Sequence, residues 1–191
     1  MLLVLIALNL KERNLLSVLL IAFADQLLGI ITFKILMAGL LYKIPVYILL
    51  IYLAWRLRYA QLGALAIALL IIVLGAECYW AVKDYPAPAI HFYLLLMFTV
   101  LLMRRCLFLR TIIFRSWGAT ALPIDWHYYY LLAVFIYIDV AMLGEYLLRH
   151  LFAVQSLFIY DIYPYIIHII HALLLLAFSA EYLARYPRFR A

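Results

Sequence analysis

The sequence predicts an all-α fold, a polytopic α-helical integral membrane protein with about six transmembrane helices and one basic interfacial helix. Of its 191 residues, 72% are hydrophobic and only 13% are charged, whereas soluble domains are roughly 45–50% apolar and about 25% charged. The apolar runs, such as residues 62–73 and 166–178, are unbroken. Strands of a transmembrane barrel would alternate apolar and polar residues, so helices are the predicted elements.

Six apolar segments are candidates for transmembrane helices, which need about 20 residues, although the second segment is shorter. The break before the fourth segment contains Pro86 and Pro88, which interrupt a helix, and Arg56 and Arg58 end the second. The chain contains no hydrophilic run long enough for a soluble domain, so we expect a single transmembrane domain over residues 1–191. The predicted spans are residues 15–41, 44–55, 62–82, 89–103, 128–148 and 157–183.

The boundary between the first two segments is open to two interpretations, because Lys34, Lys43 and Pro45 interrupt this region. A turn near Lys34 would give two helices of ordinary length. A turn at residues 42–45 would give one long and one short helix, and proline is favoured in the first turn of a helix. The short helix would then either cross the membrane or re-enter it, which gives six or five spans.

Basic residues predict the orientation, because lysine and arginine are enriched in cytoplasmic loops. With six spans and a cytoplasmic N-terminus, most of the 15 lysines and arginines lie on the inner side. An odd number of spans would place one arginine cluster on the outer side. We therefore expect both termini in the cytoplasm. The small polytopic form, without secretory features, favours a bacterial inner (plasma) membrane.

A basic stretch over residues 104–117 follows the fourth segment. Its four arginines alternate with large apolar side chains, a mixture typical of an amphipathic helix that lies in the inner interface and contacts anionic lipid. The alternative is a docking surface for an acidic partner protein. The net charge of +6 follows from this topology, so no nucleic-acid partner is expected. The docking candidates are Arg104, Arg105, Arg110 and Arg115.

Ionisable side chains inside a membrane are costly and therefore are candidates for function. On the last segment, Asp161, His168 and Ser179 fall nearly on one line at about 100° per residue, and His171 flanks that line. This stripe predicts a polar interface between helices or subunits, a proton or cation path, or a metal or haem site. The candidates for an ion path or polar interface are Asp25, Glu77, Asp139, Asp161, His168 and His171.

The metal hypothesis rests on His168 and His171, whose three-residue spacing allows both imidazoles to bind one ion. Asp139 is the nearest candidate for a further ligand. No Glu-x-x-His motif accompanies the pair, which argues against a di-iron bundle, and the other histidines lie near helix ends, which argues against a haem. We expect no cofactor. The sequence also lacks the serine-elbow, zinc-helix and phosphate-loop motifs of soluble enzymes.

Three functional hypotheses follow. The first is a non-enzymatic membrane subunit that forms homo-oligomers, or anchors a partner in a hetero-complex, with or without an ion-conducting pore. A membrane effector of a defence or stress system is one example. The second is a small stand-alone transporter or channel with an intramembrane Asp/His path for a proton or cation. The third is a metal- or haem-binding redox protein. Enzymatic activity is the less favoured class.

Overall fold

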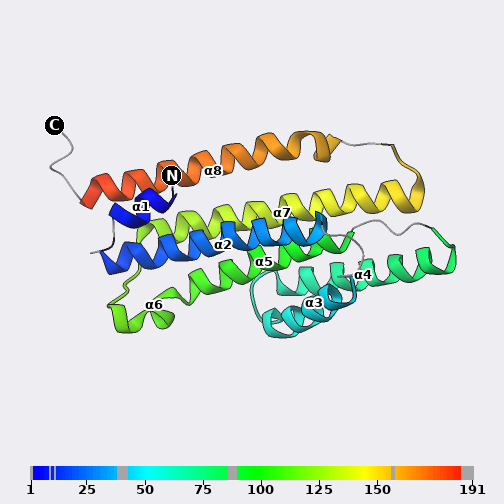
Figure 1. The fold of residues 1–191 in the computed structure, drawn as a ribbon, viewed down its shortest axis with the longest axis horizontal. Helices are drawn as coiled ribbons and strands as arrows, with labels where there is room; N and C mark the ends of the chain where they lie inside the picture. The colour runs from blue at the N-terminus through cyan, green and yellow to red at the C-terminus, as the bar shows by residue number, and fades with distance from the viewer. Residues whose placement is uncertain are drawn as a thin grey trace.

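The computed structural model of the protein describes residues 2–8, 10, 12–37, 43–85, 90–155 and 158–185. Across these residues it is all-helical, with 88% helix and no strand, which confirms the predicted all-α fold. α8 lies along one side of the bundle and α3 and α4 lie along the other, with α2, α5 and α7 between them (Figure 1). A short first helix, α1 (Leu2–Leu8), packs against α2.

Five helices in the described part of the chain are long and apolar enough to cross a membrane. Each is built of leucine, isoleucine, valine and aromatic residues with few charges, and these helices indicate a membrane-embedded protein. Residues 38–41 of the first predicted span, residue 89 of the fourth and residue 157 of the sixth lie outside the described residues. The five helices are α2 (Arg13–Met37), α4 (Gly63–Val82), α5 (Ile90–Phe108), α7 (Pro123–Phe152) and α8 (Phe158–Arg185).

The predicted second span, residues 44–55, falls on the short helix α3 (Lys43–Leu57). Its 15 residues rise about 22 Å, which is less than the roughly 30 Å of a hydrocarbon core. Lys43 forms an ion pair with Glu77 near the end of α4. At the other end, the turn after α3 places Gln61 against Arg104 of α5. α3 therefore runs antiparallel to α4 between nearly the same two levels.

α5 is the central helix of the bundle and packs against α7, α2, α3 and α4. Leu94, Phe98 and Leu101 on this helix are completely or almost completely buried. Because four other helices pack against α5, it fixes their positions relative to one another (Figure 1).

The start of α8 is held against the end of α7 by one carboxylate. Glu145 accepts hydrogen bonds from the backbone N–H groups of Ile159 (3.2 Å) and Tyr160 (2.9 Å). The first N–H groups of a helix lack partners within the helix, and a carboxylate there also favours the helix dipole. This contact makes α7 and α8 an antiparallel pair.

The predicted interfacial helix over residues 104–117 is not one continuous helix, which corrects the expectation. α5 continues to Phe108, and the chain then forms α6 (Arg110–Ile113) and the 3-10 turn η2 (Arg115–Trp117). The physical reason is Arg110, whose guanidinium is only 1% exposed. It turns inward to bond with groups of α2, α7 and the loop before α7, so this segment folds back on the bundle.

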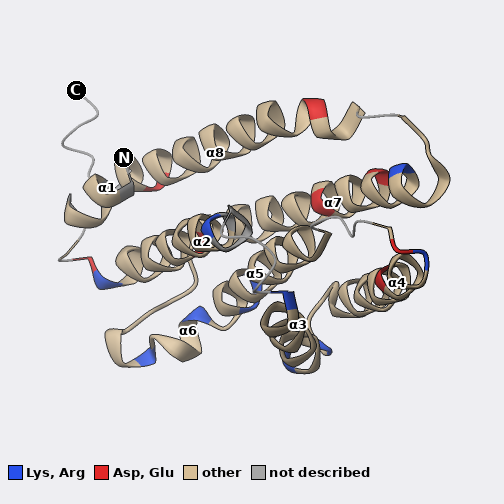
Figure 2. Cartoon of the chain, turned by 45° about the vertical axis from the view of Figure 1, so that its right-hand side comes forward, with Lys and Arg blue, Asp and Glu red and all other residues tan. Residues whose placement is uncertain are grey.

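Basic side chains gather at one end of the bundle, which we call the arginine end. At this end, Arg110 of α6 contacts Asn14 at the start of α2 and Asp125 at the start of α7. The α3–α4 turn and the end of α5 lie at the same end, where Gln61 contacts Arg104. Figure 2 shows Lys and Arg around α6 and α3 and at the start of α2, with further basic residues beside α4 and at the end of α7, where acidic residues of α4, α7 and α8 also lie. The arginine end carries Arg56, Arg58, Arg104, Arg105, Arg110 and Arg115.

Candidate functional site

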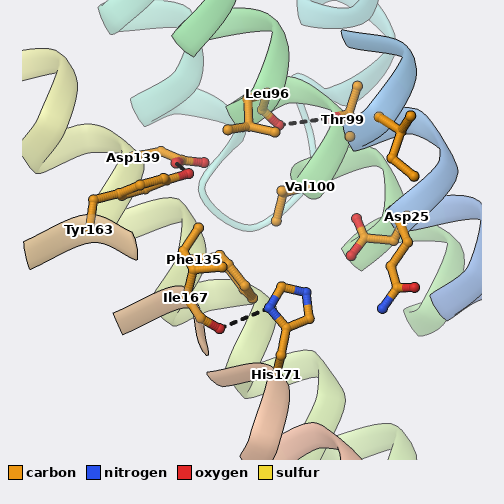
Figure 3. A pocket seen from close by; sticks show the side chains of 12 residues that line it. Asp25, Leu96, Thr99, Val100, Phe135, Asp139, Tyr163, Ile167 and His171 are labelled. Atoms are coloured by element: carbon orange, nitrogen blue, oxygen red, sulfur yellow. Dashed lines mark hydrogen bonds between the residues drawn. The ribbon is translucent and has the colours of Figure 1, made fainter. Parts of the chain in front are cut away.

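A cavity of about 430 Å³ lies among α2, α5, α7 and α8. Its volume is in the range of binding pockets for small molecules, roughly 300–1,000 Å³. Its walls are apolar over most of their area, and polar side chains reach it from all four helices (Figure 3). Within the described part of the chain, no lysine or arginine lines it. The polar residues of this pocket are Asp25, Gln26, Thr99, Asp139, Tyr163 and His171.

The polar groups of the pocket lie at the middle of their helices. Asp25 is the central residue of α2, and Thr99 is the central residue of α5. Asp139 and His171 are within about two residues of the centres of α7 and α8. If these helices cross a bilayer from end to end, the pocket lies close to the midplane, where many transporters bind substrates and coupling ions.

Asp139 is the most deeply buried charged group of the pocket, with only 2% of its surface exposed. Its Oδ1 accepts a hydrogen bond from the hydroxyl of Tyr163 at 3.3 Å, whereas its Oδ2 has no partner among the described residues. Figure 3 shows this second oxygen on the pocket side of the carboxylate. Buried polar atoms are normally satisfied, and a buried carboxylate without a counter-charge is costly.

Asp25 supplies a second carboxylate from the opposite wall (Figure 3). Its Oδ2 accepts a hydrogen bond from the hydroxyl of Tyr128 at 3.1 Å. The neighbouring lining residues Gln26 and Ile30 are exposed, and Ile30 retains 59% of its surface. The pocket therefore opens to the surroundings beside α2.

His171 contributes one ring nitrogen, Nε2, that has no hydrogen-bond partner among the described residues. Its Nδ1 lies 2.8 Å from the carbonyl oxygen of Ile167, and since a carbonyl oxygen only accepts, Nδ1 carries a proton. In the neutral ring, Nε2 is then an acceptor. Figure 3 shows this nitrogen on the side of the ring toward Asp25. Phe135 holds the ring edge-on, with ring centroids 5.7 Å apart.

This arrangement suits a small cation or a proton. Two carboxylates from different helices face a largely apolar space, and among the described residues no lysine or arginine lines it to balance their negative charge. Carboxylate, amide and hydroxyl oxygens are ligands for hard cations. A proton on either carboxylate would likewise remove the cost of burying its charge.

The other candidate residues lie outside this pocket. Glu77 forms an ion pair with Lys43 and accepts a hydrogen bond from Tyr47 at 2.9 Å. Asp161 and His168 lie on the exposed surface of α8. The structure thus brings together Asp25, Asp139 and His171 and separates them from the other three candidates.

The predicted histidine pair is divided between two surfaces of α8. His171 lines the pocket, whereas His168 is exposed and its Nδ1 contacts the carbonyl oxygen of Pro164 at 2.6 Å. Among the described residues, no group of three or more His, Cys, Asp or Glu is placed to hold a metal ion. The metal hypothesis therefore gains no support from this geometry.

Tyr163, Tyr128 and Thr99 were not singled out from the sequence. Tyr163 and Tyr128 each donate a hydrogen bond to one of the two pocket carboxylates. The chain contains 17 tyrosines, many of which lie at interfaces, so composition does not distinguish these two. Thr99 bonds to its own helix through the Leu96 carbonyl oxygen at 2.7 Å.

Two of the four predicted docking arginines are buried inside the protein. Arg104 is 4% exposed and Arg110 is 1% exposed. Arg110 is committed to Asp125 and neighbouring oxygens, so it is not available to a lipid surface or to an acidic partner. Arg104 has only neutral partners, Arg105 is half-buried and Arg115 is exposed, and for these three the docking prediction stays open.

No protein-family model, no curated protein and no solved structure matches this chain. No function can therefore be transferred from a relative. The functional argument rests on the chemistry of the four-helix pocket.

Proposed function

We propose that this chain is a small membrane transporter or channel that carries a proton or another small cation through the pocket of Asp25, Asp139 and His171. The observation that supports this proposal is Asp139 Oδ2, a buried carboxylate oxygen that has no partner among the described residues, in a pocket that none of their lysines or arginines lines. Ionisable groups in membrane interiors mark ion pathways and proton relays.

Each polar group has a defined part in the proposal. Asp139 and Asp25 bind the cation or accept the proton on the oxygens that their tyrosine partners leave free. Tyr163 and Tyr128 orient the two carboxylates through their hydroxyls. His171 accepts a proton at Nε2 while Nδ1 stays bonded to its helix. The opening beside α2 connects this site with the exterior of the bundle.

The experiment is a flux measurement on Asp139→Asn in sealed liposomes, with a pH-sensitive dye inside and H⁺, Na⁺ and K⁺ gradients applied in turn. Asparagine keeps the shape but removes the negative charge. We expect flux to fall about 10-fold or more, because a charge-assisted interaction contributes roughly 1.5–3 kcal/mol and 1.4 kcal/mol corresponds to a factor of ten.

The matched control is Asp161→Asn, which removes a carboxylate from the exposed surface of α8, and we expect it to conduct like the unaltered protein. Unchanged flux in Asp139→Asn would contradict the proposal. So would liposomes with the unaltered protein that leak no faster than empty ones for all three cations.

We further propose a bacterial inner-membrane location in which the arginine end faces the cytoplasm. The supporting observation is the clustering of arginines around α6 and the α3–α4 turn (Figure 2), which matches the cytoplasmic enrichment of basic residues. Because α3 passes between the two levels of the bundle, the helices alternate in direction, and the start of α2 and the end of α8 lie at that end, which favours cytoplasmic termini.

A second candidate function is a subunit of a larger assembly. Asp161 and His168 lie on the exposed surface of α8, although polar side chains within membranes almost always face protein or water. This favours a homo-oligomer or a hetero-complex that covers α8. The mass of the detergent-purified complex distinguishes the two candidate functions. A monomer would contradict the assembly and would not affect the proposal for the four-helix pocket.

A further inference from the structure

A second hollow, of about 260 Å³, lies at the arginine end between the α3–α4 turn, α5 and α7. It is more polar than the four-helix pocket, and no acidic side chain of the described residues lines it. We call it the arginine hollow. Its lining residues are Tyr59, Ala60, Gln61, Leu101, Arg104, Arg105, Phe108 and Tyr129.

Arg104 is buried in the wall of this hollow and has only neutral partners. Its Nε donates to the carbonyl oxygen of Tyr129 at 3.3 Å, its Nη1 to the carbonyl oxygen of Gln61 at 3.3 Å, and its Nη2 to Gln61 Oε1 at 2.8 Å. The guanidinium also stacks over the Tyr129 ring at 3.8 Å. Since a guanidinium has five N–H donors, these bonds leave one on each terminal nitrogen.

The positive charge of Arg104 has no counter-charge among the described residues, where the ion pairs are Lys43–Glu77 and Arg110–Asp125. Arg104 is 4% exposed, and a buried charge is normally paired. Arg105 lines the same hollow and lies over the Phe108 ring at 5.9 Å. Two positive charges therefore share a hollow that no carboxylate of the described residues lines, which is the electrostatic requirement for an anion.

The surroundings of the arginine hollow specify the kind of anion. A smaller hollow of about 140 Å³ adjoins it, shares Phe108 and Tyr129, and is walled by Leu107 and Trp126. The carboxylate in that second hollow, Asp125, is already bonded to Arg110. Tyrosine and tryptophan at a helix end are typical of the level of lipid headgroups. The arginine hollow therefore fits the charged headgroup of a lipid, and the smaller aromatic hollow beside it fits the attached acyl chain.

We propose that the arginine hollow binds the phosphate group of an anionic phospholipid. The free N–H groups of Arg104 and the guanidinium of Arg105 donate to phosphate oxygens, for which arginine is well suited. An acyl chain lies along Phe108 and Trp126. This site is separate from the four-helix pocket and does not depend on the function proposed there.

The test is thermal unfolding of delipidated protein in a neutral detergent, with phosphatidylglycerol, phosphatidylcholine or inorganic phosphate added in separate titrations. A ligand that binds only the folded state raises the melting temperature with concentration. We expect phosphatidylglycerol to raise it, and phosphatidylcholine and inorganic phosphate to have little effect. In Arg105→Gln, the phosphatidylglycerol concentration for half the shift rises about 10-fold or more.

Arg115→Gln is the matched control, because Arg115 is an exposed arginine at the same end that does not line the hollow. We expect it to respond to phosphatidylglycerol like the unaltered protein. Three results would overturn the proposal: equal stabilisation by phosphatidylcholine, equal stabilisation by inorganic phosphate alone, or an unchanged response in Arg105→Gln. Because Arg105 is half-buried and makes no ion pair among the described residues, its replacement leaves the bundle folded.

Discussion

Arg110 and Asp139 are both almost completely buried, but the protein treats the two charges differently. The terminal nitrogens of Arg110 donate to oxygens of Asn14, Ser17, Thr120 and Asp125, and the last of these neutralises the charge. Asp139 has one neutral donor, the Tyr163 hydroxyl, and its second oxygen has no partner among the described residues. One charge is paired within the protein, and the other is not.

This difference teaches how to separate a structural charge from a functional one. Arg110 joins α6 to α2 and α7 at the arginine end, so its pairing fastens segments that are distant in sequence. Asp139 lies at mid-depth beside a cavity, and no lysine or arginine of the described residues lines that cavity to form an ion pair with it. A buried charge that the fold leaves without a partner indicates a ligand, whereas a paired charge indicates architecture.

The largest expected effect is on stability, from Arg110→Ala. The variant would leave Asp125 and several oxygens without their common donor, and breaking a buried ion pair costs about 3–5 kcal/mol. We expect a large loss in the free energy of unfolding, measured by denaturant titration in detergent micelles. Arg115→Ala, at an exposed position, should change it by about 0.5 kcal/mol or less. Similar losses in the free energy of unfolding for both variants would contradict the view that the Arg110 ion pair stabilises the fold.

The next effect is on transport and compares two histidines on one helix. His171→Ala removes the Nε2 acceptor from the pocket, so we expect the flux in liposomes to fall about 10-fold. His168→Ala alters the exposed surface of α8 and should leave the flux unchanged. The reverse pattern, with flux lost only in His168→Ala, would move the path from the pocket to the outer surface of α8.

The smallest effect is expected for Tyr163→Phe, which removes the hydroxyl that donates to Asp139 Oδ1 at 3.3 Å. A single neutral hydrogen bond contributes about 1 kcal/mol, so the apparent affinity for the transported cation should change about five-fold. The measurement is flux against cation concentration. No change in either affinity or maximal rate would mean that Tyr163 does not orient the carboxylate.

Much of the fold was predictable from the sequence, because the membrane restricts the backbone to helices and apolar runs mark them. The short α3 was harder to place, since Lys43 and Pro45 permitted more than one turn position. The 104–117 segment was predicted wrongly as one helix. Alternating arginine and apolar residues also occur where a helix ends and an arginine turns inward, and the pattern alone does not separate the two cases.

The candidate site was predictable only in part. Asp25, Asp139 and His171 were identified because charge in a membrane is costly wherever it occurs. Asp161 and His168 carry the same signal but lie on the exposed surface of α8. Helical periodicity assigns residues to a face of their own helix, and it contains no information about which neighbouring helix that face meets.

The sequence by itself determined that this is a helical membrane protein, which of its ends is basic and which intramembrane groups are chemically unusual. Those properties follow from composition and local pattern, since each helix satisfies its own backbone hydrogen bonds. Only the tertiary structure decided that Arg110 is paired, that Arg104 is not, and that Asp25 and Asp139 share one cavity. Pairing depends on side chains brought together by helix packing, and helices far apart in sequence, such as α2 and α7, meet only in the folded bundle.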